Sequence, residues 1–224
     1  MVDADPQANA SSGLGVDIRS VEQSIYECVV NGDDPKGAIT NTEVEGLDII
    51  PSHIDLVGAE IEMLNMENRE QILKQILVPL KERYDYILID TQPSRDSLLL
   101  SNAIAAADYV LIPLKCDSFS EDSAFRTYVL CNEMRKSKTS RIKGVGVMLT
   151  MVQKSAASQD IRSDCRAKLG ATLFNAEIAF GKSVDNSINR CVPVCYSART
   201  QPPAKSYVAA YEELKKRLAE LEEK

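Results

Sequence analysis

Aspartates follow short apolar segments at two places in the sequence, and carboxylates in such positions can serve phosphate chemistry. One is Asp90, which ends the run Tyr86-Ile87-Leu88-Ile89 and precedes Thr91-Gln92-Pro93-Ser94. The carboxyl ends of parallel strands line the ligand crevice of a sheet, so an Asp that ends a buried strand faces whatever binds there. In nucleotide hydrolases this Asp holds the water shell of Mg²⁺. The alternative is an Asp that caps the next helix or starts a turn.

The second acidic position lies near the N-terminus, where Asp3 and Asp5 precede Pro6-Gln7. In an extended chain, alternation places these two carboxylates on the same side, about 7 Å apart, so both can reach one metal–phosphate centre. A polar turn opened by Asp5-Pro6 is the alternative.

Other chemistries lack the residues they need. The six cysteines form no CxxC pair and the single histidine is His53, so neither a zinc site nor a Ser-His-Asp or Cys-His arrangement is expected. A phosphate-binding loop needs a glycine-rich stretch followed by Lys and Ser or Thr. Gly181-Lys182-Ser183 has that ending, but Ala176 stands where the first glycine belongs, so we interpret the tripeptide as a chance match.

The elements that must position these residues are buried strands that alternate with helices. Four segments are short, apolar and rich in β-branched residues, as buried strands are. They are residues 47–50, 86–89, 109–112 and 145–149. Helical periodicity marks residues 67–83, 120–135, 155–169 and 203–224. This alternation predicts an α/β fold with three layers, a mostly parallel sheet with helices on both faces. No linker or repeat divides the sequence, so we expect residues 1–224 to form a single domain.

The last of these helices carries a narrow apolar stripe at steps of four, three, four and three residues. Its members are Tyr207, Tyr211, Leu214, Leu218 and Leu221. The stripe predicts docking on the domain or on a partner. The mixed polar face does not favour a membrane surface.

The formal net charge of −7 is unevenly distributed. Residues 1–125 carry 8 basic and 23 acidic side chains, whereas residues 126–205 carry 14 basic and 5 acidic ones. The basic segment is a candidate face for a polyanion, the alternative being a solvated surface whose charges segregate by chance. No signal peptide or long apolar run is present, which indicates a soluble, cytoplasmic protein.

Taken together, these segments resemble the ParA/MinD family of deviant Walker A ATPases, and ParA-type (Soj-like) partition ATPases most closely. Residues 2–15 are similar to the family's Walker A′ block, residues 84–94 to its Walker B block and residues 106–114 to the strand beyond. Further blocks follow the middle of the family in the same order: residues 24–26, 46–52 and 56–60. So many blocks in the same order make the resemblance specific, and it implies a P-loop NTPase-like fold.

The resemblance also implies roles, cofactors and partners. Asp5 would activate or position the attacking water, and Asp3 would support the Mg²⁺–phosphate site. Asp90 and Pro93 would bind the cofactor, and Asp90 would hold Mg²⁺ through water. The cofactors would be ATP and Mg²⁺. Members of the family dimerise around two ATP molecules and then bind DNA without sequence preference. The expected partners are therefore a second copy, DNA and a ParB-like centromere-binding protein, with no membrane, in the cytoplasm at the nucleoid.

Two departures from the family pattern matter. The family's lysine-containing Walker A block lies about one βα unit upstream of the A′ block and is absent from this sequence. The resemblance thus predicts an N-terminally truncated chain without the first strand and P-loop, inactive alone. A family stretch that contacts adenine and DNA aligns with residues 178–181, where its Pro, Arg and Asn are replaced. Nearby cations are the candidate DNA contacts, or ordinary surface charges: Lys182, Arg190, Arg199 and Lys205.

Two other functions stay open. One is a non-catalytic, ParA-like interaction protein that has lost its nucleotide chemistry. The other is a MinD-like ATPase that cycles on membranes, which the acidic, Trp-free C-terminal segment disfavours.

Overall fold

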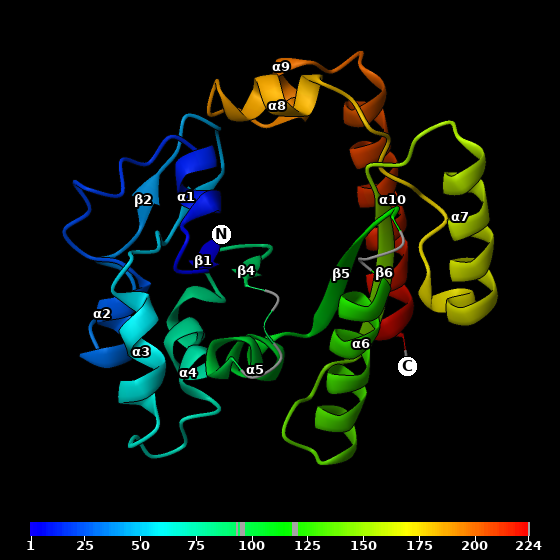
Figure 1. Cartoon of the computed structure of the whole chain (residues 1–224). Helices are drawn as coiled ribbons and strands as arrows, with labels where there is room; N and C mark the ends of the chain where they lie inside the picture. The colour runs from blue at the N-terminus through cyan, green and yellow to red at the C-terminus, as the bar shows by residue number, and fades with distance from the viewer. Residues whose placement is uncertain (93, 95–96, 118–120, 224) are drawn as a thin grey trace. The chain divides into compact units, whose positions relative to one another are not determined.

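The computed structural model describes residues 1–92, 94, 97–117 and 121–223. Two compact units make up the chain, and Figure 1 labels most of their helices and strands. Unit 1 comprises Met1–Ala107 and Ile188–Val192, and unit 2 comprises Asp108–Ser187 and Pro193–Lys224. The single domain expected over residues 1–224 stays a prediction.

Unit 1 combines short strands with a set of helices (Figure 1). The strands are β1 (Val2–Ala4), β2 (Thr40–Asn41), β3 (Asp48–Ile49) and β4 (Ile89–Thr91). The helices are α1 (Asn9–Gly13), α2 (Ile25–Val30), α3 (Leu56–Met63), α4 (Ile72–Leu77), the 3₁₀ helix η1 (Val78–Leu80) and α5 (Leu98–Ala106). Strands β1 and β4 run parallel, with Asp3 opposite Asp90, and β2 pairs with β3 in antiparallel fashion.

One hydrophobic core joins α2, α3, α4 and α5 to the strands of unit 1. Each of these helices contributes at least one large side chain with no exposed surface: Ile25, Leu56, Leu73 and Leu99. Val2 of β1 belongs to the same core. Burial of such side chains contributes roughly 1.5–3 kcal/mol each, so packing on β1 holds the N-terminal strand in place although it is only three residues long.

Unit 2 contains two long strands and the longest helices of the chain (Figure 1). The strands are β5 (Tyr109–Lys115) and β6 (Gly144–Thr150). The helices are α6 (Glu121–Lys136), α7 (Ala156–Leu169), the 3₁₀ helix η2 (Gly170–Thr172), α8 (Ser183–Ile188), α9 (Val194–Ser197) and α10 (Pro202–Glu222). Helix α8 belongs to unit 2 except for its last residue, Ile188, which begins the second segment of unit 1.

The strands β5 and β6 pair in parallel over seven residues and form the middle layer of unit 2. On one face, their side chains pack against α6 and α7: Ile112, Leu114, Val147 and Leu149 with Ala124 and Cys165. On the opposite face, they pack against α10: Tyr109, Leu111 and Met148 with Ala210 and Leu214. Strand alternation separates the two sets, so three layers follow directly from the period-two pattern.

Gly146 of β6 faces the α10 side of this sheet, where space is smallest. A Cβ atom at this position would lie 2.4 Å from Cε2 of Phe174 and 2.5 Å from the hydroxyl of Tyr109. No larger residue fits without moving these two rings, so the glycine permits the close packing of Phe174.

The strands and helices expected in unit 2 are present, whereas three expected elements differ in unit 1. The strand expected at residues 47–50 is reduced to β3, which pairs with β2 in antiparallel fashion. The strand expected at residues 86–89 is reduced to β4, and Tyr86 and Leu88 are 53% and 58% exposed. In the described residues β4 has only β1 as a ladder partner, so its pairing cannot extend beyond three residues. The helix expected at residues 67–83 begins only at Ile72, because Asn68 adopts a left-handed φ of 52°.

The apolar stripe expected on the C-terminal helix is only partly correct. Leu214 packs against the sheet, but Tyr207 and Tyr211 are exposed, and Ala210 is the buried residue of that turn. Arg217 also lies inward, because its long side chain fills the space above Phe174. The expected stripe is therefore correct for Leu214 and Leu221, the second of which lies beside Gly144 of β6, and wrong for the two tyrosines.

None of the described helices is both long enough and apolar enough to cross a bilayer.

Candidate functional site

The predicted acidic residues of unit 1 lie together at the ends of β1 and β4. Asp3 and Asp90 are paired residues of the parallel ladder, and Asp5 follows β1 by one residue. The structure therefore brings Asp90 near Asp3 and Asp5, which lie 85 or more positions earlier in the sequence, as the family resemblance implied.

Asp3 is fully buried, and the chain itself satisfies both of its carboxylate oxygens. The backbone N–H and the hydroxyl of Ser11 donate to Oδ2, at 2.8 and 2.7 Å, and the backbone N–H of Asp5 donates to Oδ1, at 3.2 Å. The hydroxyl of Ser11 in turn accepts from the backbone N–H of Ser52, at 3.1 Å. Asp3 thus ties α1 and residue 52 to β1, and its support of a Mg²⁺–phosphate centre stays a prediction.

Ser11 was not among the residues singled out from the sequence. A serine eight positions after an aspartate carries no recognised spacing, and only the fold of residues 5–11 brings the two side chains together. Charge-assisted hydrogen bonds of this kind are about twice as strong as neutral ones, so Ser11 is a main anchor of this loop.

Asp5 lies in the turn that connects β1 to α1. Its Oδ1 accepts from the backbone N–H of Gln7, at 2.9 Å, and its carbonyl accepts from Ala8, which has a left-handed φ of 52°. The polar turn considered as an alternative is therefore present. It leaves Asp5 partly exposed, where its carboxylate can also meet a ligand.

Asp90 is half-buried, and its pKa is raised above the ordinary value of 3.8. Burial is the largest cause, the charges of Asp3 and Asp5 add to it, and a backbone hydrogen bond from Thr91 opposes it weakly. The folded state therefore favours the protonated form of Asp90. The stability that this form contributes is fully present below pH 3.8 and is lost as the pH rises through the raised pKa.

This arrangement fits a hydrated divalent cation better than one held directly by the protein. Among the described residues, no group of three or more His, Cys, Asp or Glu side chains has the geometry to ligate a metal. Mg²⁺ commonly keeps several waters and uses one or two carboxylates plus substrate phosphates. Asp90 supplies one such carboxylate, whose pKa is raised by burial and by the charges of Asp3 and Asp5, and a nearby cation would favour its ionised form. Pro93, the other predicted cofactor contact, lies outside the described residues.

The four candidate DNA-binding cations are all exposed. Three of them belong to unit 2 near the start of α10: Lys182, Arg199 and Lys205. Lys182 follows Gly181, which lies so close to Pro203 that an added Cβ would be 2.7 Å from Cγ of that proline. Arg190 belongs to the second segment of unit 1.

The charge asymmetry follows the division into units. Unit 1 contains 8 Lys and Arg against 19 Asp and Glu, a net charge of −11, whereas unit 2 contains 18 against 14, a net charge of +4. A polyanion therefore meets less repulsion at unit 2 than at unit 1.

The parallel ladders, the helices packed on them and the acidic strand ends define an α/β protein of the P-loop NTPase class. A solved structure of cobyrinic acid a,c-diamide synthase from Mycobacterium smegmatis, with bound ATP analogue and magnesium, matches this chain with a TM-score of 0.74. The match covers 81% of this chain and 74% of that one, at 27% identity. The α/β fold expected from the sequence is thus confirmed.

Within this class, the AAA domain family model matches residues 1–143. The sporulation initiation inhibitor protein Soj of Bacillus subtilis is 41% identical over 152 residues, which are 68% of this chain and 60% of Soj, less than two thirds of its length. The chromosome partitioning protein ParA of Myxococcus xanthus is 33% identical over 218 residues, which are 97% of this chain and 77% of that protein. The chain belongs to the ParA-type partition ATPase family, which confirms the resemblance seen in the sequence.

Proposed function

We propose that this protein acts in DNA partition as a ParA-type ATPase, in which Mg²⁺-ATP at Asp3, Asp5 and Asp90 controls dimerisation and non-specific DNA binding. The observation that carries this proposal is the raised pKa of Asp90, paired in register with Asp3 at the end of β1 and β4. Burial and the charges of Asp3 and Asp5 disfavour the ionised form of Asp90, and binding of a metal–phosphate group would offset that effect.

Each of the three aspartates has its own role in the proposed site. Mg²⁺-ATP, when bound, would supply the phosphoryl group and a cation that neutralises its charge. Asp90 would hold Mg²⁺ through water, and Asp5 would position the attacking water. Asp3, whose oxygens are engaged by Ser11 and Asp5, keeps the β1–α1 turn in the conformation that presents Asp5.

Replacing Asp90 by Asn tests this site without the need for turnover. Removal of a charge that burial and the charges of Asp3 and Asp5 disfavour is expected to raise the free energy of unfolding and the melting temperature at pH 7. Added Mg²⁺ is expected to raise the melting temperature of the wild-type chain, because an ion that binds only the folded state stabilises it. The same addition is expected to have little effect on Asp90→Asn, as followed by differential scanning calorimetry with and without MgCl₂.

Asp85→Asn is the matched control, because Asp85 is an exposed carboxylate five residues earlier and its loss is expected to leave the Mg²⁺ response intact. An equal Mg²⁺ response in wild type and Asp90→Asn contradicts the site.

The same samples test whether the chain hydrolyses ATP. The sequence has no glycine-rich phosphate loop, so the 224-residue chain by itself is proposed not to hydrolyse ATP. Mg²⁺-dependent hydrolysis that Asp90→Ala abolishes would contradict that statement.

Dimerisation, DNA and partner binding form the rest of the proposal. The proposed partners are a second copy, DNA contacted without sequence preference, and a ParB-like centromere-binding protein, in the cytoplasm at the nucleoid. Support comes from the membership of the family and from the exposed cations near the start of α10. Non-specific binding needs several phosphate contacts and no base readout, which exposed Lys and Arg side chains can provide.

Neutralising the four candidate cations together tests their role in DNA binding. The variant Lys182→Gln, Arg190→Gln, Arg199→Gln and Lys205→Gln is expected to bind duplex DNA more weakly in the presence of Mg²⁺-ATP. The slope of log K against log salt is expected to become shallower by about 0.9 for each phosphate that is no longer neutralised, as measured by fluorescence anisotropy over a salt series.

The control variant removes the same number of exposed charges at other positions. It carries Gln at Lys36, Lys81, Lys138 and Lys154, which are all exposed. If both variants weaken binding equally, net charge and not the four candidates accounts for the effect, and the assignment of these residues is wrong.

A further inference from the structure

Asn31 and Gly32 follow helix α2 of unit 1, and they form the single Asn-Gly pair of the sequence. Asparagine is among the thermally labile residues of proteins. The backbone nitrogen of the next residue can attack its side-chain carbonyl carbon, Cγ, and close a cyclic imide. The attack is easiest when the next residue is glycine, because no Cβ then hinders the nitrogen. The pair is therefore a candidate site of chemical modification.

The two reacting groups of this pair are accessible. Asn31 and Gly32 are both exposed. In the described part of the chain, no hydrogen bond holds the side-chain amide of Asn31 or the backbone N–H of Gly32. Gly32 has a left-handed φ of 74°, and no atom beyond its chain neighbours lies within 4 Å of the position that a Cβ would occupy. Neither the attacked carbon nor the attacking nitrogen is thus shielded by the fold.

Ring closure requires the backbone of Asn31 to rotate, because its ψ of −15° is helical and the imide ring fixes a different value. Two hydrogen bonds restrain this end of the helix, and both use the carbonyl of Glu27. The N–H of Asn31 donates to it at 2.9 Å and that of Asp33 at 3.4 Å, which is long for a hydrogen bond. Helix ends fray, and α2 has only six residues, so its last turn opens readily.

We infer that Asn31 is a site of spontaneous deamidation in the folded protein. In the first step, the nitrogen of Gly32 forms a bond to Cγ of Asn31, and its proton leaves with the side-chain nitrogen as ammonia. In the second step, a solvent water molecule hydrolyses the cyclic imide. Hydrolysis at Cγ gives aspartate, and hydrolysis at the former backbone carbonyl gives isoaspartate, in which the main chain runs through the side chain. Water is the only co-reactant, and nothing is oxidised or reduced.

The products disturb the end of α2 in two ways. Isoaspartate adds a methylene group to the main chain, which displaces the two N–H groups that donate to Glu27. Both products also place a negative charge at the C-terminal end of a helix, where the helix dipole disfavours it. Burial raises the pKa of the Cys28 thiol to about 11, and the charges of nearby carboxylates add to that shift: Asp33, Glu27 and Asp34. The new charge thus joins an acidic helix end and loosens it, independently of the proposed nucleotide site.

Incubation of the folded 224-residue chain in mildly alkaline buffer tests this inference. Trypsin then releases residues 20–36, a peptide whose single asparagine is Asn31. Mass spectrometry is expected to show that this peptide changes from the amide to the acid during incubation, relative to a sample digested at the start. Isoaspartate in it is identified by acceptance of a labelled methyl group from an isoaspartyl methyltransferase. The incubated protein is expected to melt at a lower temperature than incubated Asn31→Gln.

Two variants locate the reaction at this pair. Gly32→Ala is expected to slow the conversion by about tenfold or more, because a Cβ hinders the attacking nitrogen. Alanine is strained at a φ of 74°, so Asn31→Gln serves as a second variant that leaves the glycine in place. It is expected to form no isoaspartate, because the longer side chain closes its ring far more slowly. Far-ultraviolet circular dichroism checks that both variants are folded.

The matched control is Asn65→Gln, because Asn65 is also exposed and follows the end of a helix, α3, but precedes Met66 instead of a glycine. It is expected to form isoaspartate as fast as wild type does. Methyl acceptance that persists in Asn31→Gln would place the reaction at another residue and overturn the inference. The inference is equally wrong if residues 20–36 stay unconverted in the folded chain while they convert in a urea-denatured sample, because the fold then protects the site.

Discussion

Replacing Asn102 by Leu is expected to lower the free energy of unfolding of unit 1 by about 2–4 kcal/mol. Asn102 lies in α5 with no exposed surface, and its side chain joins α5 to the start of α4. Its Oδ1 accepts from the backbone N–H of Leu73, at 3.2 Å, and its Nδ2 donates to the carbonyls of Arg69 and Leu98, at 2.7 and 2.9 Å.

The effect is large because the partners are left behind without a substitute. The N–H of Leu73 belongs to the first turn of α4, so it has no acceptor within its own helix. Leu73 is itself fully buried. A buried donor without a partner costs roughly 1–3 kcal/mol, and the carbonyl of Arg69 adds to this. Leu is not smaller than Asn, so the expected destabilisation does not arise from a cavity.

Chemical denaturation, together with hydrogen exchange of the α4 and α5 amides, measures this destabilisation. The control is Asn132→Leu, because Asn132 is only half-buried and its hydrogen bonds go to Tyr128 and Arg135 of its own helix. A change of less than about 0.5 kcal/mol is expected there, as for most surface changes. An equal destabilisation in both variants would mean that the link between α4 and α5 contributes nothing specific.

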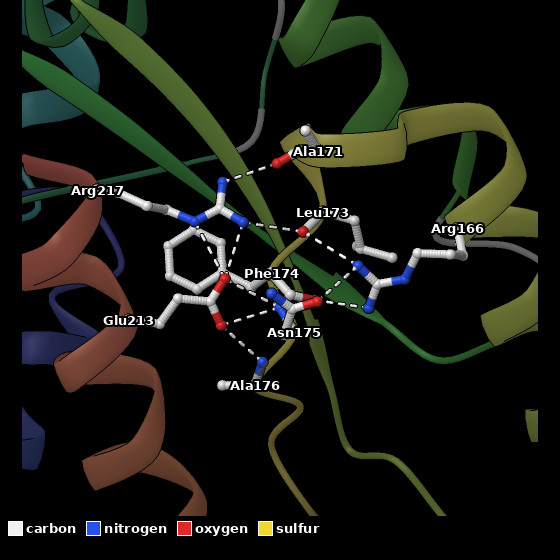
Figure 2. A network of polar contacts seen from close by, with 8 residues as sticks. All are labelled: Arg166, Ala171, Leu173, Phe174, Asn175, Ala176, Glu213 and Arg217. Carbon is white, nitrogen blue, oxygen red and sulfur yellow. Dashed lines mark hydrogen bonds and ion pairs between the residues drawn. The ribbon is translucent and has the colours of Figure 1, made fainter. Parts of the chain in front are cut away.

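Replacing Arg217 by Met is expected to destabilise unit 2 by about 2–4 kcal/mol. Figure 2 shows Arg217 and Glu213 of α10 directed at residues 171–176, which follow α7. Arg217 donates to the carbonyls of Ala171 and Leu173, both at 2.9 Å, and its guanidinium lies 4.2 Å from the ring centroid of Phe174.

Glu213 completes this network from the same helix (Figure 2). It accepts from the backbone N–H groups of Asn175 and Ala176, at 2.9 and 2.8 Å, and pairs with Arg217 at 2.8 Å. Both side chains are largely buried, with 20% of Arg217 and 16% of Glu213 exposed. Removing Arg217 therefore leaves the partly buried carboxylate of Glu213 without its cation and the carbonyl of Ala171 without this donor, whereas the carbonyl of Leu173 keeps the hydrogen bond from Arg166, at 3.3 Å. Met keeps the apolar stem, so the measured destabilisation isolates the polar interactions.

The pH dependence provides a second readout for the same network. Burial tends to raise the pKa of Glu213, but hydrogen bonds from Ala176, Asn175 and Arg217 outweigh it and lower the pKa below the ordinary 4.5. The ionised form is thus favoured in the folded state. Its contribution is fully present above pH 4.5 and is lost as the pH falls through the lowered pKa. The stability difference between wild type and Glu213→Gln is expected to shrink over that range.

Lys215→Met is the control for Arg217→Met, because Lys215 pairs with Glu212 and contacts the Tyr211 ring on the more exposed side of α10. An exposed pair contributes about 0–1 kcal/mol. Denaturation followed by circular dichroism measures both variants. Equal destabilisation, or a pH-independent difference for Glu213→Gln, would show that the buried network is not what holds α10 to residues 171–176.

Periodicity in the sequence was sufficient to predict the long elements. Strands β5 and β6 appear as apolar, β-branched runs because both of their faces are buried, and α6, α7 and α10 are long enough for their 3.6-residue period to be recognised. The shorter elements of unit 1 gave weaker signals. The start of α4 beyond Asn68, for example, depends on one left-handed residue, which a pattern of apolar positions does not reveal.

The candidate site divides in the same way. That Asp3, Asp5 and Asp90 lie near one another was implied by the family resemblance, which assigns all three to one Mg²⁺–phosphate site, and the β1–β4 ladder pairs Asp3 with Asp90. What each carboxylate does there depends on interactions between distant residues. Asp3 is engaged by Ser11, and the raised pKa of Asp90 results from burial and two neighbouring charges.

The amino-acid sequence was thus enough to establish the α/β class, the family and the position of the acidic strand ends, because these depend on residue type and spacing along the chain. Tertiary structure decided which side chains are buried, paired or exposed. Asn102, Ser11 and the Glu213–Arg217 pair have polar side chains whose partners lie elsewhere in the fold. Val57 of α3 is the opposite case, since this apolar residue stays exposed in the packing of unit 1. Burial depends on which elements pack together, and a linear pattern does not contain that information.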